Sequence, residues 1–238
     1  MINDINYAGK SFRKDLGLYV DTIESYGTPK KSYTFHEVLG RNGSLAVDDH
    51  RFEDHEETFN CYIRKDFLPN FRAVQAFFNS LKGYQRLERT NSPDLFEMGL
   101  YEGGISPTPT QLLKAGVFPF RLRLHPEKWL KSGEITVDMT EASELENPTL
   151  FESKPLIRIY GTGTVNINND YITIDSASSF TFIDLDCETM NASSAGNNAN
   201  QYIEILNDAE ITLKPGTNYV TCSGSITKVE ITPRWFTL

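Results

Sequence analysis

The chain has 238 residues, of which 39% are hydrophobic and 12% aromatic, so it can bury one large β core or two smaller ones. Its formal net charge is −9 and it has no basic block, which argues against nucleic acid as its main partner. No apolar run is long enough to cross a membrane, and the first twenty residues lack the apolar core of a signal peptide. We therefore expect synthesis in a cytoplasm and no membrane partner.

The first clear structural signal is a β-hairpin. Two strand-like runs, residues 32–39 and 44–47, lie on either side of Gly40-Arg41-Asn42-Gly43. Asn-Gly between two such runs is the strongest local indication of a hairpin. The sequence therefore predicts a hairpin here, followed by a densely acidic stretch at 48–57 and a strand at 58–63.

The acidic stretch carries His50 and His55, which together with the carboxylates could bind a metal ion. Their spacing of five residues fits no zinc signature, however, and charged residues commonly mark a solvated hairpin. We therefore predict a solvated hairpin and no metal site.

One helix is predicted, over residues 69–82. Apolar side chains recur there at spacings of three and four, which places them on a single helix face. The stripe consists of Phe67, Phe71, Val74, Phe78 and Leu81. Asp66 or Asn70 could cap its start and Gly83 could end it. We expect this face to pack against a sheet.

Strands are predicted next at residues 84–88 and 95–101. The segment 103–109 is rich in glycine and proline, so it is either an arm that contacts a neighbouring subunit or an ordinary surface loop. A strand at 117–124 follows, and Pro126 and Gly133 should loosen the chain after it. Residues 132–155 are acidic and polar, and we expect the boundary between two domains within them, giving domains 1–135 and 136–238.

The C-terminal half lacks helical periodicity and contains short strand signals at regular intervals, with a polar loop expected at 191–200. This pattern predicts an antiparallel sandwich or barrel. The expected strands cover residues 156–160, 165–167, 171–174, 180–187, 202–206, 210–214, 219–221 and 229–231.

The last residues are unusually aromatic. Pro233 cannot donate a hydrogen bond to a sheet, so Arg234, Trp235 and Phe236 either continue as an edge strand or bend away. A chain end of this composition should be anchored on an apolar surface.

Catalytic motifs are weak. Asp184, Asp186 and Glu188 alternate along one predicted strand, a pattern that could hold calcium or supply the paired carboxyl groups of a glycosidase. The solvent side of an antiparallel strand looks the same, and we favour that interpretation. The sequence contains no phosphate-binding loop, nucleophile elbow or metalloprotease helix, so we predict a non-catalytic protein without a cofactor.

The order of short motifs along nearly the whole chain resembles the distal tail protein (Dit) family of phages and prophages with long, non-contractile tails. These motifs are Tyr7-Ala8-Gly9-Lys10, Leu16-Gly17-Leu18, Gly40-Arg41-Asn42-Gly43-Ser44-Leu45, Gly83-Tyr84-Gln85-Arg86-Leu87, Asn147-Pro148-Thr149, Ser153-Lys154-Pro155-Leu156-Ile157, Gly161-Thr162-Gly163, Thr173-Ile174-Asp175, Leu213-Lys214-Pro215-Gly216-Thr217-Asn218, Gly224-Ser225-Ile226-Thr227 and Pro233-Arg234-Trp235-Phe236-Thr237-Leu238.

The resemblance implies a fold and a role. The fold would be mainly β, with an N-terminal β-rich ring-forming domain that contains one helix and a C-terminal galectin-like antiparallel β-sandwich. The last strand, about 232–238, would pack back on the N-terminal domain. The protein would form a homohexameric ring in the virion, alone or as two stacked rings, between the tail tube protein and the tail-tip protein. It would also offer a site for a receptor-binding protein.

A ring of this kind needs surfaces between neighbouring copies, and two segments are candidates: the hairpin with its acidic extension, and the loop at 102–109. Ordinary solvent exposure is the alternative for both. The candidate contact residues are Arg41, Asn42, Phe52, Glu102, Gly103, Gly104, Ile105 and Pro107, and the residues expected to fix the C-terminus are Pro233, Arg234, Trp235 and Phe236.

Two other functions compete with the hub. The C-terminal domain could bind host cell-wall polysaccharide through Tyr160, Tyr171 or Tyr202, or it could cleave a glycan with Asp184 or Asp186. We place the assembly hub first, the carbohydrate-binding module second and the enzyme last, because the motif order covers the full chain.

Overall fold

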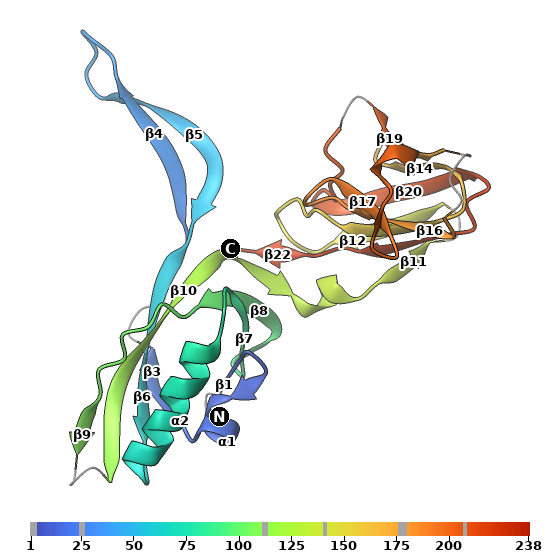
Figure 1. Ribbon diagram of the computed structural model, residues 1–238. Helices are drawn as coiled ribbons and strands as arrows, with labels where there is room; N and C mark the ends of the chain where they lie inside the picture. Colours follow the sequence, from blue (N-terminus) through green and yellow to red (C-terminus); the bar gives the residue numbers. More distant parts are fainter. Residues whose placement is uncertain (1–3, 24–26, 111–113, 140–141, 176–179, 207–208) are drawn as a thin grey trace. The chain divides into compact units, whose positions relative to one another are not determined.

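The computed structural model describes residues 4–23, 27–110, 114–139, 142–175, 180–206 and 209–238 (Figure 1). The chain divides into two compact units, which we call the N-terminal unit (Met1–Lys128 with Leu238) and the C-terminal unit (Trp129–Thr237). Both are built mainly from β-strands, so the predicted fold class is confirmed.

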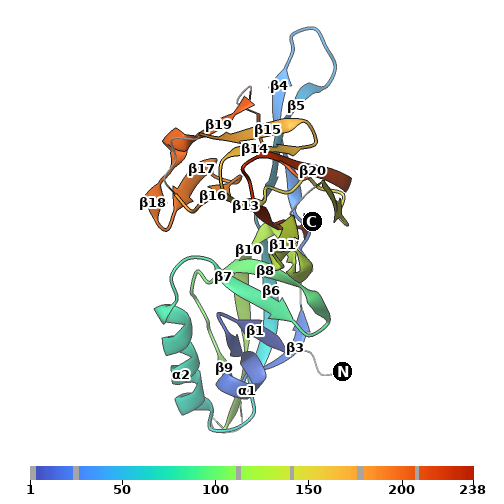
Figure 2. The same ribbon diagram turned by 90° about the vertical axis from the view of Figure 1, so that its right-hand side faces the viewer.

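The N-terminal unit contains a sheet in the order β2-β1-β7-β8-β10-β6-β3, with β9 also paired to β10 (Figure 2). A separate two-stranded sheet is formed by β4 and β5. The elements are β1 (Ile5–Tyr7), β2 (Lys10–Ser11), α1 (Phe12–Leu16), β3 (Tyr19–Ile23), β4 (Lys30–Glu37), β5 (Ser44–Glu53), β6 (His55–Ile63), α2 (Phe67–Ser80), β7 (Gln85–Arg89), β8 (Ser92–Leu100), β9 (Thr108–Thr110) and β10 (Ala115–Leu130).

Helix α2 packs on one face of this sheet, as its apolar stripe predicts. Phe67, Phe71, Val74 and Phe78 are all buried, and the Phe78 ring centroid lies 4.4 Å from that of Phe120 in β10. The helix begins two residues earlier than predicted, directly after the left-handed residue Asp66.

A second, shorter helix was not predicted. Helix α1 has a polar start and a glycine end: the Ser11 hydroxyl accepts a hydrogen bond from the Lys14 amide, and Gly17 has a φ of 63°. Serine before and glycine after a short run are ordinary helix boundaries. The five-residue helix was missed because it is too short to show a periodic apolar stripe.

The C-terminal unit is an antiparallel sandwich. Its six-stranded sheet has the order β11-β21-β13-β16-β17-β18, and its five-stranded sheet has the order β12-β20-β14-β15-β19. The elements are a 3₁₀ turn (Lys131–Glu134), β11 (Val137–Met139), β12 (Ser143–Asn147), β13 (Leu156–Tyr160), β14 (Gly163–Ile167), β15 (Asp170–Ile174), β16 (Phe182–Asp186), β17 (Asn191–Ser194), β18 (Asn197–Asn198), a 3₁₀ turn (Asn200–Tyr202), β19 (Ile203–Ile205), β20 (Gly216–Gly224), β21 (Lys228–Thr232) and β22 (Phe236–Thr237).

Three local expectations were wrong. The polar loop expected at 191–200 contains β17 and β18, because Ala192 and Ala199 are buried in the core and β17 pairs with β16. Strand β10 continues through Pro126. The last residue pair between β10 and β6 is Leu124 with His55, so β6 needs no hydrogen bond from the amide that Pro126 lacks. The run 210–214 forms only an isolated bridge between Leu213 and Ser153.

Candidate functional site

The most exposed apolar element described is the β4–β5 hairpin, which lies outside the large sheet (Figure 1). A two-stranded ribbon by itself is at best marginally stable in water. This one nevertheless has large hydrophobic side chains in the open: Phe35 is 68% exposed and Leu39 is completely exposed. Such side chains on a soluble protein commonly mark an interaction surface.

Both faces of the ribbon are apolar. Residues that pair directly across antiparallel strands share a face. Phe35 pairs with Ala46, with Tyr33 on the same side, whereas Leu45 and Val47 lie on the opposite side as partners of His36 and Thr34. A ribbon with one apolar face could fold back on its own sheet, but two apolar faces can be covered together only if the ribbon lies between other surfaces.

Polar contacts fix the register at the base of the hairpin. Both Ser32 and Thr34 donate side-chain hydrogen bonds to the Asp49 carboxylate, at 2.8 and 2.9 Å, and these bonds lower the pKa of Asp49. The Lys31 ammonium lies 2.5 Å from the Asp48 carboxylate. Asp48 and Asp49, which follow the turn, therefore hold the two strands together.

The predicted contact residues in this hairpin lie at its two ends. Arg41 and Asn42 are exposed in the turn, where the Arg41 amide donates to the Val38 carbonyl at 3.1 Å, and Phe52 is half-buried near the base, opposite Lys31. The apolar side chains between them were not singled out, although the alternation of Tyr33 and Phe35 was visible in the sequence.

The second predicted segment, residues 102–107, is a non-repetitive loop. Gly103 and Gly104 have φ angles of 100° and 85°, values that favour glycine, and Ile105 packs against the core of the unit. Pro107 is half-buried directly before β9. The loop is therefore anchored at Ile105 and exposed at its glycines.

Glu102 connects this loop to the base of the hairpin. Its carboxylate accepts a hydrogen bond from Arg123 at 2.6 Å, and Arg123 also lies 3.7 Å from Glu56 at the start of β6. Arg121 lies 3.3 Å from the same Glu56. A groove of about 270 Å³ opens between these side chains and the loop. The structure thus brings the loop close to the hairpin base but not to Arg41 and Asn42 at the tip.

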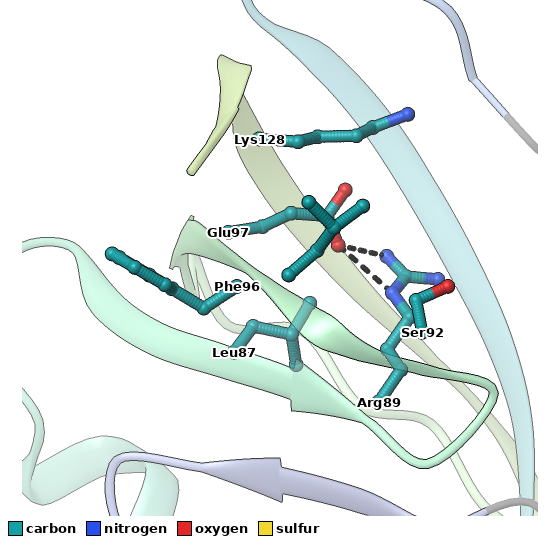
Figure 3. A pocket seen from close by; sticks show the side chains of 7 residues that line it. Leu87, Arg89, Ser92, Phe96, Glu97 and Lys128 are labelled. Atoms are coloured by element: carbon teal, nitrogen blue, oxygen red, sulfur yellow. Dashed lines mark hydrogen bonds and ion pairs between the residues drawn. The ribbon is translucent and has the colours of Figure 1, made fainter. Parts of the chain in front are cut away.

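A buried charge cluster in the N-terminal unit was missed from the sequence. Arg89 donates to both carboxylate oxygens of Glu57 and to Glu97 at 2.8 Å, and all three side chains are less than 10% exposed. Figure 3 shows Arg89 and Glu97 joined in the wall of a small pocket of about 100 Å³ that Lys128 also lines. The three residues come from three different strands, so no local sequence motif predicts the cluster.

The two histidines of the predicted acidic hairpin lie in different environments. His50 is exposed, whereas His55 is buried beside the charge cluster, and its Nδ1 has no hydrogen-bond partner within the described part of the chain. Burial lowers the pKa of His55. Within the described residues, no group of three or more His, Cys, Asp or Glu side chains is arranged to hold a metal ion.

The carboxylates considered for glycan cleavage are bound in ion pairs. Arg158 donates to both oxygens of Asp184, at 2.6 and 3.0 Å, and Arg234 to both oxygens of Asp186, at 2.7 and 3.3 Å. The Arg234 hydrogen bonds lower the pKa of Asp186. Glu188 lies in the turn after β16. These carboxylates therefore do not form the open pair that hydrolysis of a glycoside requires.

The three tyrosines considered for sugar binding are not brought together. Tyr160 lies in β13 of the six-stranded sheet, with its hydroxyl 3.3 Å from Glu230, and Tyr171 lies in β15 of the other sheet. Tyr202 lies in the 3₁₀ turn before β19, with its ring edge-on to Phe180.

The C-terminal residues bend after Pro233. Arg234 has a φ of 59°, and its amide donates to the Gly133 carbonyl at 2.8 Å. A Cβ atom on Gly133 would lie 2.3 Å from the Trp235 nitrogen, so only glycine allows this approach. The chain therefore bends at Arg234, as one of the two alternatives had it, and Phe236 and Thr237 then form the short strand β22.

The aromatic end is anchored as expected. Trp235 is 4% exposed and belongs to the core of the C-terminal unit, and its carbonyl accepts a hydrogen bond from the Leu130 amide at 2.8 Å. Phe236 stacks on Phe151, with ring centroids 5.5 Å apart. The Pro233 carbonyl accepts a hydrogen bond from the Ser153 hydroxyl at 2.8 Å.

No helix in the described part of the chain is long and apolar enough to span a membrane. No protein-family model and no curated protein sequence matches the chain.

Among solved structures, the chain is similar to the crystal structure of the SPP1 Dit (gp 19.1) protein, described as a paradigm of the hub adsorption apparatus in phages that infect Gram-positive bacteria. The TM-score is 0.70 at 14% identity, with 100% of both chains covered. It also matches a chain of the phage p2 baseplate in its activated conformation with Sr, with a TM-score of 0.49, 7% identity and coverage of 97% of this chain and 98% of that chain. The first match agrees with the motif order found in the sequence, and the chain therefore has the fold of a phage distal tail protein.

Proposed function

We propose that this protein is a structural hub of a phage tail. Six copies close into a ring at the distal end of the tail, between the tail tube and the tip apparatus that adsorbs to the host. The observation that supports this most is the full-length match to the SPP1 Dit protein. Because that match extends over both units, it is more than a likeness to one common β domain.

The exposed hairpin gives the proposal a physical basis. A ring requires a head-to-tail interface that leaves no subunit with an unpaired surface. The β4–β5 hairpin has apolar side chains on both faces, and neighbouring copies would bury them. In the proposed ring Arg41, Asn42 and Phe52 lie at the ends of this contact, and the loop from Glu102 to Pro107 contributes beside the hairpin base.

Each domain has its own part in the hub. The N-terminal domain, residues 1–135, forms the ring, and the C-terminal domain, residues 136–238, is a galectin-like sandwich that buries Trp235 in its own core. The tail tube protein, a tail-tip protein and a receptor-binding protein are the partners. The proposal includes no catalytic step, since Asp184 and Asp186 are held by arginines.

The test is the mass of the purified chain, measured by light scattering over a dilution series with negative-stain images of the peak. Six chains of 27.0 kDa have a mass of about 162 kDa, and two stacked rings have about 324 kDa. We expect one of these masses and images with a central hole. In Phe35→Ser combined with Leu39→Ser, the mass should fall to that of one chain, because the apolar contact is removed.

The matched control is Leu150→Ser, which removes another highly exposed apolar side chain (88%), this one from the C-terminal unit, and should leave the ring intact. A wild-type chain that stays monomeric at the highest concentration, both alone and with the tail tube protein, contradicts the ring. A ring that persists in the hairpin variant removes the hairpin from the interface while leaving the hub itself in place.

A further inference from the structure

The turn of the β4–β5 hairpin contains a chemically reactive pair of residues. Asn42 is followed by Gly43, and no other asparagine in the sequence precedes a glycine. Asparagine is a labile residue, because its side-chain carbonyl carbon can be attacked by the backbone nitrogen of the residue that follows it. A following glycine has no Cβ atom to obstruct this attack. The most reactive asparagine of the sequence therefore lies in an exposed turn.

The structure leaves both reacting groups free. Arg41, Asn42 and Gly43 are all exposed. Within the described residues, neither the Asn42 side chain nor the Gly43 amide has a hydrogen-bond partner, although the Arg41 amide donates to the Val38 carbonyl. Gly43 has a φ of 81°, and apart from its chain neighbours no heavy atom lies within 4 Å of the place that a Cβ atom would take. The Gly43 nitrogen can therefore move toward the side chain, and water can reach both groups.

Other exposed asparagines lack this combination. Asn79 lies inside helix α2, where backbone amides donate to carbonyls four residues back. Asn198 lies in β18, and the amide of the next residue, Ala199, donates a backbone hydrogen bond of 2.9 Å. An amide that is held in a hydrogen bond must give up that bond before its nitrogen can attack a side chain. The hairpin turn is thus distinguished by its local structure as well as by its sequence.

We propose that Asn42 is a site of spontaneous modification through a cyclic imide. The Gly43 nitrogen loses its proton and bonds to the Cγ carbon of Asn42, and the C–N bond of the side-chain amide breaks, so that ammonia leaves with the proton. The resulting succinimide takes up one water molecule and opens at either of its two carbonyl carbons. One opening gives aspartate, and the other gives isoaspartate, in which the main chain runs through the former side-chain carbonyl. Nothing is oxidised or reduced, and water is the co-reactant.

Both products change the turn. Each adds a negative charge next to Arg41, and isoaspartate also adds a methylene group to the main chain. The turn sets the pairing of the two strands, which begins with Glu37 opposite Ser44. An extra backbone atom therefore disturbs the pairs closest to the turn and the position of the exposed Leu45. The weakening of a subunit contact by this change rests on the proposed function, whereas the modification itself does not.

The test follows the full chain by peptide mapping and mass spectrometry during incubation in water labelled with heavy oxygen. The chain with Phe35→Ser and Leu39→Ser is incubated in parallel, so that the turn is also sampled where no ring covers it. We expect the peptide that contains Asn42 to exchange its amide nitrogen for labelled oxygen, as a mixture of aspartate and isoaspartate. The conversion should be faster in alkaline than in mildly acidic buffer, because the attacking nitrogen must lose its proton.

Asn42→Gln should lose the signal, since the longer side chain would have to close a less favourable six-membered imide. This variant keeps the polar amide in the turn, so a folding defect is not expected. The peptide that contains Asn79 is the internal control and should stay unlabelled over the same period. An unchanged Asn42 peptide in both chains, a product that is aspartate alone, or equal labelling of the Asn42 and Asn79 peptides would each overturn the proposal.

Discussion

The two units bury different kinds of core. The N-terminal core is rich in aromatic side chains, and the rings of Tyr7, Phe12, Phe78 and Phe120 meet between helix and sheet. This unit also buries the Glu57–Arg89–Glu97 charge cluster, whose arginine lies over the Phe59 ring. The C-terminal core is mostly isoleucine, leucine and valine, and its buried polar side chains, such as Asn147 and Asn218, are uncharged.

The difference follows from the layers that each unit packs. Two sheets facing one another are about 10 Å apart, a space that alternating branched aliphatic side chains fill well. A helix on a sheet leaves a less regular space, which large rings can fill in tilted and edge-to-face contacts. We therefore expect the stability of the N-terminal unit to depend on pH and on single aromatic rings, and the stability of the C-terminal unit to depend on aliphatic side-chain volume.

The comparison can be tested with two separate spectroscopic signals. Both tryptophans, Trp129 and Trp235, belong to the C-terminal unit, so tryptophan fluorescence reports its unfolding. Both α-helices in the described part of the chain, the long α2 and the short α1, belong to the N-terminal unit, so circular dichroism at the helix band reports that unit.

The largest effect is expected for Phe78→Ala. Phe78 contacts several rings of the N-terminal core, and its removal should cost about 3–5 kcal/mol of unfolding free energy. In urea unfolding the helix signal should move to lower denaturant while the fluorescence transition remains. Ile159→Ala in the C-terminal core is the mirror experiment and should move only the fluorescence transition. If both signals move together in both variants, the units unfold as one and the comparison fails.

A somewhat smaller effect is expected for Arg89→Met. The substitution keeps the length of the side chain but leaves Glu57 and Glu97 buried without their cation, at a cost of about 3 kcal/mol to the N-terminal unit. Arg158→Met, which removes a half-exposed arginine from an ion pair in the C-terminal unit, is the control and should have little effect. Equal losses in the two variants would show that burial of the cluster is unimportant.

The smallest effect concerns pH. Burial lowers the pKa of His55 below 6.5, aided by Lys128 and Arg89 and opposed by Glu97 and Glu57. The unfolded chain therefore takes up this proton first, and the N-terminal unit should lose stability as the pH falls below about 6.5, by at most about 1.4 kcal/mol per pH unit.

The measurement is the urea midpoint of the helix signal at several pH values. His55→Gln should flatten the slope between pH 7 and 5, whereas His36→Gln, on the exposed hairpin, should leave it unchanged. A slope that is the same in wild type and His55→Gln would exclude His55 as its source.

Much of the fold could be predicted because its signals are local. The stripe from Phe67 to Phe78 follows from helical spacing, the hairpin at Asn42-Gly43 from turn chemistry, and the sandwich strands from alternation. The strands at 191–198 could not be found in this way, because small and polar side chains are held there by pairing with β16 rather than by their own preference.

The sequence by itself therefore determined the mainly β class, the long helix, the aromatic C-terminus and the motif order of a distal tail protein. Only the tertiary structure decided which side chains meet: Arg89 with Glu57 and Glu97, and Asp186 with Arg234. The physical reason is sequence separation. Turn and periodicity signals arise between residues a few positions apart, whereas strand order and register bring together residues from distant parts of the chain.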